Sequence, residues 1–315
     1  RPVVLTSRNR LVDAPYQLDA DEQVRVTLTL PAHDPPWWLP LALQQHGYHT
    51  VAVANNVLTP MFSRSFTRGW DRFSTQPGGD DSHTVDLALQ ELEQLPSPFF
   101  LWIHLFEPHD PQTKHPGSPN FGSSVVDKYD HEVASMDREL GRVVRALESR
   151  PNTALIFSAD HGESFIDDYQ IHGIGLWEDA IHIPLIVRAP GWQPGVNESP
   201  ASLVDLAPTI LGFARAPVPT GLDGRNLKDL RGDAPVISDL FHLDEKGRVR
   251  LDEVTATNSR LRLWHDGLKQ SDVLVKTGDL TLPPRVRDNV VPPPELADAL
   301  ARYIEDSIPP MSASP

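Results

Sequence analysis

The stretch TALIFSADHGES, residues 153–164, places a polar cluster directly after a short run of apolar and β-forming residues. Such a run predicts a buried strand, and the polar residues mark its end. One interpretation is a turn in which Asp160 caps the following segment and Gly162 adopts a positive φ. The other is a metal or anion site. This string by itself does not decide between the two.

Segments with helical periodicity alternate with short apolar runs on both sides of this stretch. Strands are predicted at residues 50–54, at PFFLWIHLF (98–106) and at IPLIVRA (183–189), which we expect to be buried. A long helix is predicted by apolar residues spaced four, three, four, three and four positions apart, which we expect to form one packed face: Tyr129, Val133, Met136, Leu140, Val143 and Leu147. The alternation predicts an α/β fold with a mostly parallel central sheet covered by helices on both faces.

The chain changes character from about residue 216. A turn-rich segment is followed by three short strand candidates, APVISDLF, RLRLWH and DVLVKT, and by a final helix, PPELADALARYIEDS. We therefore expect an α/β domain over residues 1–232 and a smaller α+β subdomain over residues 233–315 that packs on it.

The composition excludes several classes of function. The 315 residues hold 28 Lys and Arg against 43 Asp and Glu, and the net charge of -15 argues against nucleic acid or an anionic membrane as a partner. There is no cysteine, which rules out disulfides, thiolate zinc sites and a cysteine nucleophile within these residues. No apolar run approaches the roughly 20 residues of a membrane helix, and no secretory signal is visible. The first residue is Arg1, which is compatible with removal of an upstream piece, so the localisation stays open.

Polar clusters follow the predicted strands at the end where parallel sheets bind ligands. One strand runs into Glu107, His109 and Asp110 and the next into Asp160, His161 and Glu163, while a later turn carries two further histidines, His172 and His182. Imidazole with carboxylate suits Zn, Mn or Fe better than Mg, whereas Ca prefers oxygen ligands. The shared position of the clusters favours a metal-assisted hydrolytic site.

Several ordered motifs resemble the sulfatases of the alkaline-phosphatase-like superfamily. The motifs are FFLWIHLFEPHDP, YDHEVASMDRELGRVVRALE, ALIFSADHGES, HGIGLWEDAIHIPLIVRAPG, SLVDLAPTILGFA and GLDGRNL. The resemblance is strong over residues 39–230 and loose over the C-terminal part. It implies the α/β fold of that superfamily and metal-dependent hydrolysis of sulfate esters.

The resemblance also implies roles for single residues. Asp160 and His161 match the family's metal-binding pair, and His109 matches the histidine that contacts the transferred group and protonates the leaving oxygen. His172 lies where the family places a substrate-contacting histidine or lysine. A structural role is the preferred interpretation for four other residues: His104, Asp137, Glu178 and His182. The family favours one Ca²⁺ as the metal, whereas the ligand types favour Zn or Mn.

The N-terminal segment departs from the family pattern. Sulfatases begin with a strand ending in further metal-binding aspartates, followed by a CxPSR-type segment that yields formylglycine, or by a Ser or Thr nucleophile in phosphoryl-transferring relatives. RPVVLTSRNRL is open to three interpretations: a relic of that segment with Val4, Ser7 and Arg8 at matching positions, the tail that follows it, or an ordinary loop. No nucleophile is identified within these residues, so we expect the nucleophile segment to be cut off or to lie upstream.

Three functions follow from this departure. The first is a metal-dependent hydrolase that acts on a small anionic sulfate ester. The second is a phosphodiester or phosphonate hydrolase, or a phosphoryl transferase, of the same superfamily. The third is a catalytically inactive binding module that retains the fold. The sequence does not specify the alcohol or sugar of the ester, or the oligomeric state.

Overall fold

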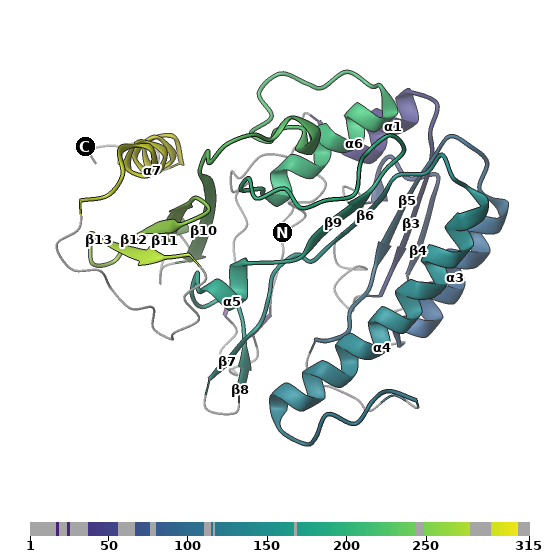
Figure 1. Cartoon of the computed structure of the whole chain (residues 1–315), viewed down its shortest axis with the longest axis horizontal. Coiled ribbons are helices and arrows are strands. Elements are labelled where there is room, and N and C mark those ends of the chain that lie inside the picture. Colours follow the sequence, from purple (N-terminus) through teal and green to yellow (C-terminus); the bar gives the residue numbers. More distant parts are fainter. Residues whose placement is uncertain are drawn as a thin grey trace.

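A computed structural model describes residues 17–18, 24–25, 37–55, 67–75, 80–109, 115, 117–166, 169–243, 249–277 and 291–307 (Figure 1). The positions proposed as a relic of the nucleophile segment, Val4, Ser7 and Arg8, lie outside these residues, and so does Asp110. Near the N-terminus the described residues form one short antiparallel pair, β1 (Gln17–Leu18) with β2 (Val24–Arg25).

Three parallel strands form the centre of the α/β domain. Their order is β4 (Arg72–Thr75), β3 (His49–Ala54) and β5 (Phe99–His104). Residues 50–54 of β3 are completely buried, as their run of small and β-branched side chains predicts for a central strand. The predicted parallel sheet is confirmed for these strands.

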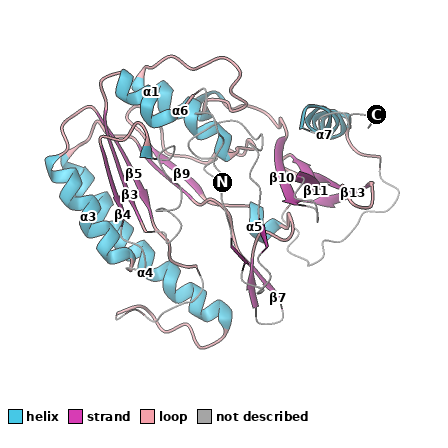
Figure 2. Ribbon diagram, turned by 180° about the vertical axis from the view of Figure 1, so that it is seen from behind, coloured by secondary structure: helices cyan, strands magenta, loops and turns pink. Residues whose placement is uncertain are grey.

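Helices cover both faces of this sheet (Figures 1 and 2). Val51 and Val53 point toward α3 (Asp81–Gln94), whereas Ala52 points toward the opposite layer, which contains α1 (Leu39–Gln45) and α6 (Leu206–Ala214). Successive side chains of a strand point to opposite faces, so a continuous apolar strand is needed when both faces are packed. The expected covering of both faces is therefore confirmed.

The long helix α4 (Val125–Ala146) forms where the spacing of its apolar residues predicts it. In its first half, however, the buried residues are not the predicted ones. Val143 and Leu147 are buried against α3 and β5 as expected, whereas Val133 is 37% exposed. The buried residues of the first half are polar: His131, Glu132, Ser135 and Glu139. Figure 1 shows that this half of α4 extends past the ends of the strands, so it has polar loops rather than the sheet beside it.

The pair β6 (Leu155–Ser158) and β9 (Leu185–Arg188) departs from the parallel arrangement, because the two strands run antiparallel. In β9, Leu185 and Val187 contact the apolar cluster beneath α6, but Ile186 is 62% exposed. The prediction of a fully buried strand was therefore wrong for β9, whose two faces meet different surroundings.

Short elements complete the region around the sheet. They are the hairpin of β7 (Ser164–Ile166) and β8 (Tyr169–Ile171), the one-turn helix α5 (Glu178–Ile181), and the 3-10 turns at Leu147–Ser149, Leu203–Asp205 and Leu227–Asp229. None of the helices in the described ranges combines the length and apolar character needed to cross a bilayer.

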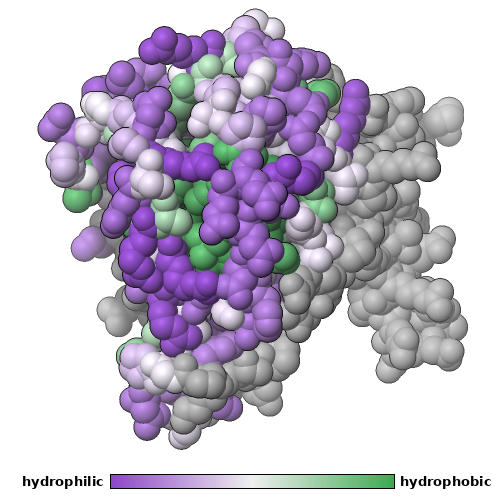
Figure 3. All heavy atoms as spheres, turned by 90° about the vertical axis from the view of Figure 1, so that its right-hand side faces the viewer, coloured by the Kyte–Doolittle hydropathy of each residue, from purple (hydrophilic) through white to green (hydrophobic). Residues whose placement is uncertain are grey.

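The C-terminal part is a four-stranded antiparallel meander with one helix packed on it. Its order is β10 (Val236–Leu243), β11 (Val249–Thr257), β12 (Leu261–Asp266) and β13 (Ser271–Lys276), and α7 (Pro294–Ser307) contacts the first three strands. Leu263 of β12 and Leu274 of β13 belong to one apolar cluster with Leu296 and Leu300 of α7. Seen from the opposite side of the molecule, where α3 and α4 lie, the described surface is mostly polar around a central group of apolar side chains (Figure 3).

Two polar contacts join the meander to the α/β domain. Arg262 of β12 forms a buried ion pair with Glu178 of α5. Glu253 of β11 accepts a hydrogen bond from the backbone N–H of Leu176, at 2.9 Å. The meander is thus attached to the segment that leads into β9.

Candidate active site

Asp160 and His161 lie directly after β6, on a loop that is open to solvent. The backbone N–H of His161 donates to Oδ1 of Asp160 at 2.9 Å, and Nδ1 of His161 lies 2.8 Å from the carbonyl oxygen of Gly162. A carbonyl oxygen only accepts hydrogen bonds, so Nδ1 carries the proton and Nε2 keeps its lone pair. His161 therefore presents Nε2 as a ligand atom beside the Asp160 carboxylate.

Close packing requires a glycine at position 162. The backbone conformation does not require one, because the φ of Gly162 is not positive. A Cβ atom at this position would lie 2.0 Å from the carbonyl oxygen of Asp179, and the Gly162 N–H donates to the carbonyl oxygen of Ala180 at 2.7 Å. The turn interpretation was therefore wrong in the conformation it assigned to this glycine. The glycine lets the loop after β6 lie against α5, which fixes the backbone next to Asp160 and His161.

Replacing Gly162 with alanine is expected to destabilise the protein by about 1–3 kcal/mol, because the added methyl group forces the loop away from α5. Gly195→Ala is the matched control: no atom lies within 4 Å of its Cβ position, so its stability is expected to stay within about 0.5 kcal/mol of the parent. Urea unfolding of the two variants checks this. Equal stabilities would contradict the packing role of Gly162.

His172 lies beside His161 and is held by Glu163. Its Nδ1 is 3.1 Å from Oε2 of Glu163, whose side chain is almost fully buried and also accepts from Nε2 of Gln170 at 2.7 Å. The ring of His172 stacks on that of His161, with 4.2 Å between centroids. A carboxylate on Nδ1 fixes the ring orientation and leaves Nε2 for other partners.

His109 completes this group from the loop after β5. Its ring stacks on Phe106 at 4.5 Å and meets the ring of His172 edge-on at 5.7 Å. Its backbone N–H donates to the carbonyl oxygen of Phe106 at 3.0 Å, so a tight turn positions it. The structure thus brings together Asp160, His161, His172 and His109, which lie on three different loops.

The residues for which a structural role was preferred lie in varied places. His104, on β5, has a buried Nδ1 that has no hydrogen-bond partner among the described residues, and burial lowers its pKa while the nearby charge of Asp160 opposes that shift. Asp137 is on the exposed side of α4. His182 is exposed and lies 2.9 Å from Glu178, which is buried in the ion pair with Arg262.

The pair Asp160 and His161 fits a divalent cation in its geometry. Oδ2 of Asp160 lies 3.7 Å from Nε2 of His161. Two ligand atoms of one ion, each about 2.0–2.4 Å from it, lie about 3–4 Å apart. The two atoms are therefore spaced as two ligands of one ion are.

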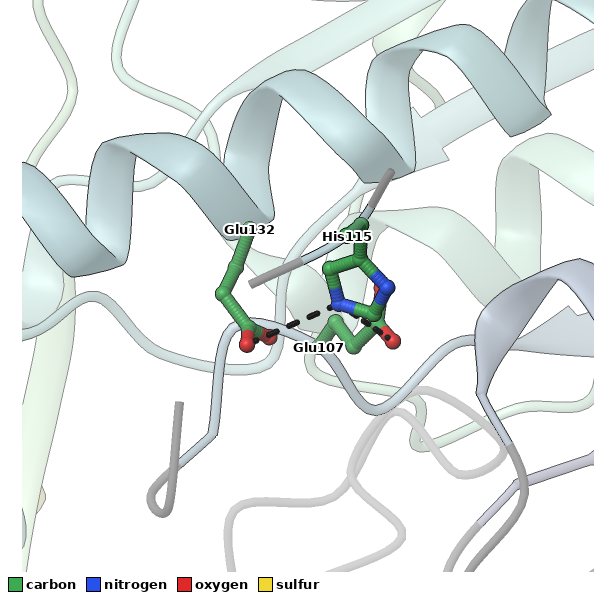
Figure 4. A group of neighbouring side chains, drawn as sticks. All are labelled: Glu107, His115 and Glu132. Carbon is green, nitrogen blue, oxygen red and sulfur yellow. Dashed lines mark ion pairs between the residues drawn. The ribbon is translucent and has the colours of Figure 1, made fainter. Parts of the chain in front are cut away.

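A second polar cluster lies beside this group. Glu107, which follows β5, His115 and Glu132 of α4 place their ligand atoms within 4.8 Å of one another. Burial and the nearby carboxylates of Asp81 and Glu132 raise the pKa of Glu107 to about 8. Figure 4 shows the three side chains pointing toward one another from separate segments.

The sulfatase family model matches residues 2–216, which is more than half of the chain. The chain belongs to the sulfatase family. This sulfatase is 35% identical to arylsulfatase K of Homo sapiens over 104 residues, which cover 32% of this chain and 19% of that protein. It is 37% identical over 103 residues to YidJ, an uncharacterized sulfatase of Escherichia coli (strain K12), and that match covers 31% of this chain and 21% of YidJ.

Solved structures show the same fold at low sequence identity. The phosphonate monoester hydrolase SpPMH of Silicibacter pomeroyi has a TM-score of 0.66 at 17% identity, over 96% of this chain and 83% of that one. BT4656 in complex with its substrate D-glucosamine-2-N,6-O-disulfate has a TM-score of 0.61 at 16% identity, over 78% of this chain and 76% of that one. The matched part of the chain spans about a fifth of the length of arylsulfatase K of Homo sapiens and of YidJ.

Sequence reasoning did not single out all the polar residues that surround the site of this sulfatase. It placed Glu163 in a polar cluster without a role, although Glu163 holds His172, and it passed over Gln170, His115 and Glu132. A signal was present for Glu132, because a carboxylate at a position flanked by buried residues of a helix needs a polar partner. For His115, in a loop of Pro, Gly and Ser, the sequence offered no such signal.

Proposed function

We propose that this chain carries the metal-binding and histidine part of a metal-dependent hydrolase of sulfate esters. The observation that supports the proposal is the convergence of Asp160, His161, His172 and His109 at one place beside the sheet. Membership of the sulfatase family supports the reaction class. The substrate is a small anionic ester. Because the chain carries a net charge of -15, a bound cation is needed to attract that substrate to the site.

Asp160 and His161 would hold the metal. A bound divalent cation supplies positive charge that polarises the ester oxygens and neutralises charge that develops on them. The family resemblance favours Ca²⁺, whereas the imidazole nitrogen of His161 favours Zn²⁺ or Mn²⁺. Metal loading with each of the three ions distinguishes these choices.

The other two histidines contact the ester group in this proposal. His109 protonates the leaving oxygen as a general acid, a role that typically contributes about 10²–10⁴ in rate. His172 contacts the sulfate oxygens through Nε2, since Glu163 occupies its Nδ1 side. Glu163 acts as a positioning residue, because it holds the ring of His172 without facing the substrate.

The nucleophile does not come from a cysteine of these residues, because the sequence has none. A cysteine precursor of formylglycine, which the family uses, is therefore absent from these residues. The phosphonate hydrolase alternative has support in the structural similarity to SpPMH over 96% of the chain. An inactive binding module is the remaining alternative.

Hydrolysis of paired aryl sulfate and aryl phosphate substrates by the full-length protein, with and without a chelator, tests the proposal. Chelator-sensitive hydrolysis that favours the sulfate supports it. A preference for the phosphate favours the phosphoryl-transferring alternative. Retained metal without turnover of either substrate favours the binding module.

A further inference from the structure

Glu107, His115 and Glu132 form a compact group with the geometry of a metal site. Nε2 of His115 lies 3.1 Å from Oε1 of Glu107 and 3.6 Å from Oε1 of Glu132 (Figure 4). Ligand atoms of a tetrahedral zinc ion, with bonds of about 2.0–2.2 Å, lie about 3.3–3.6 Å apart. Both separations are close to this spacing, and both involve the same imidazole nitrogen.

The cluster is withdrawn from solvent. The side chain of Glu132 is 1% exposed, and those of Glu107 and His115 are 12% exposed. A buried carboxylate is costly unless a positive charge or hydrogen bonds compensate for it.

A further carboxylate, that of Asp81, lies next to the cluster. Asp81 is completely buried next to the cluster, where its carboxylate accepts the backbone N–H groups of Phe106 and Glu107 at 2.9 and 3.1 Å. The carboxylates of Asp81 and Glu132 both act on Glu107 and, together with burial, raise its pKa. Two further carboxylates, of Asp81 and Glu132, thus lie close to Glu107 beside the imidazole of His115.

We propose that Glu107, His115 and Glu132 bind a transition-metal dication such as Zn²⁺, at a second site that shares no residue with the Asp160 and His161 pair. One nitrogen and two carboxylate ligands suit Zn²⁺ or Mn²⁺ better than Ca²⁺ or Mg²⁺. Three protein ligands leave the fourth tetrahedral position for water.

The metal would connect three separate parts of the chain. Glu107 follows β5 and lies two residues before His109, His115 lies in the following loop, and Glu132 lies on α4. The ion would therefore attach the segment that carries His109 to the helix beside it. This inference does not rest on the proposed hydrolase function, since the site binds metal whether or not the protein turns over an ester.

Zn²⁺ titration of the chelator-treated protein, with bound metal counted by elemental analysis, tests the second site. Glu132→Gln keeps the size of the side chain and removes its charge, and we expect it to bind one equivalent fewer than the parent, with affinity at this site lowered by about a hundredfold or more. Glu139→Gln is the matched control, because Glu139 is also a buried glutamate of α4 but pairs with Arg142. It is expected to bind as many equivalents as the parent.

The same comparison in an Asp160→Asn background separates this site from the main one. Glu132→Gln is expected to remove one equivalent there too, and Zn²⁺ is expected to raise the unfolding temperature of the Asp160→Asn protein but not of the double variant. Circular dichroism checks that each variant is folded. Equal metal content in Glu132→Gln and Glu139→Gln, in either background, would overturn the proposal.

Discussion

The Asp160→Ala protein is expected to lose the metal of the main site and to hydrolyse its ester at least about a thousandfold more slowly. Asp160 provides the carboxylate of the pair, and His161 alone offers a single nitrogen, Nε2. Loss of a metal that stabilises transition-state charge by about 4 kcal/mol lowers the rate by about 10³. Measurement of kcat/KM and of bound metal in the same preparation checks both effects.

Asp137→Ala provides the control for this variant. Asp137 is an exposed aspartate of α4 outside the site, so its replacement is expected to leave metal content and rate unchanged. If Asp160→Ala retained both its metal and its rate, Asp160 would have no role as a ligand.

The Arg262→Met protein is expected to be less stable by about 3–5 kcal/mol. Arg262 and Glu178 are 4% and 3% exposed, so the substitution leaves the Glu178 carboxylate buried without its guanidinium partner. Burial lowers the pKa of Arg262, and the charge of Glu178 opposes that shift, so each group depends on the other. Urea unfolding gives the free energy of unfolding for the comparison.

An exposed ion pair serves as the control for Arg262. Arg72 lies 2.6 Å from Glu91 with its side chain 46% exposed, and Arg72→Met is expected to cost less than about 1 kcal/mol. Losses of the same size for both variants would contradict the importance of the buried pair.

The pair of Arg262 and Glu178 also supports the loop of the candidate site. Glu178 begins α5, and the carbonyl oxygen of Ala180 in the same helix accepts the N–H of Gly162, next to His161. Weakening the attachment of α5 is therefore expected to loosen the loop that carries Asp160 and His161 as well. The C-terminal meander in this way contributes to the site without placing a residue in it.

The sequence predicted the elements with a regular pattern. The continuous apolar run of β3 and the helical spacing along α4 depend on local alternation of side chains, and both elements formed where expected. It also predicted which polar residues would meet. His109, Asp160 and His172 lie on the loops that follow β5, β6 and β8, and these loops lie close together.

The remaining features depend on contacts between distant parts of the chain. The spacing of apolar residues predicts which side chains of a helix share a face, but not which other segments pack against the helix. It therefore did not show that Glu132 faces Glu107 and His115. The partner of Glu178 is 84 residues away, at Arg262. Similarly, a glycine is needed at position 162 because the backbone carbonyl oxygen of Asp179 lies close to it. The residues around Gly162 in the sequence do not reveal this contact.

The metal content of a His115→Gln variant tests the central claim most directly, because this substitution removes the second cluster and leaves Asp160 and His161 intact. After loading with Ca²⁺, Zn²⁺ or Mn²⁺ in turn, elemental analysis is expected to find one bound equivalent of the preferred ion. The further change Asp160→Ala is expected to remove it. Absence of bound metal from the His115→Gln protein under every loading condition would contradict the claim that Asp160 and His161 form a metal-binding pair.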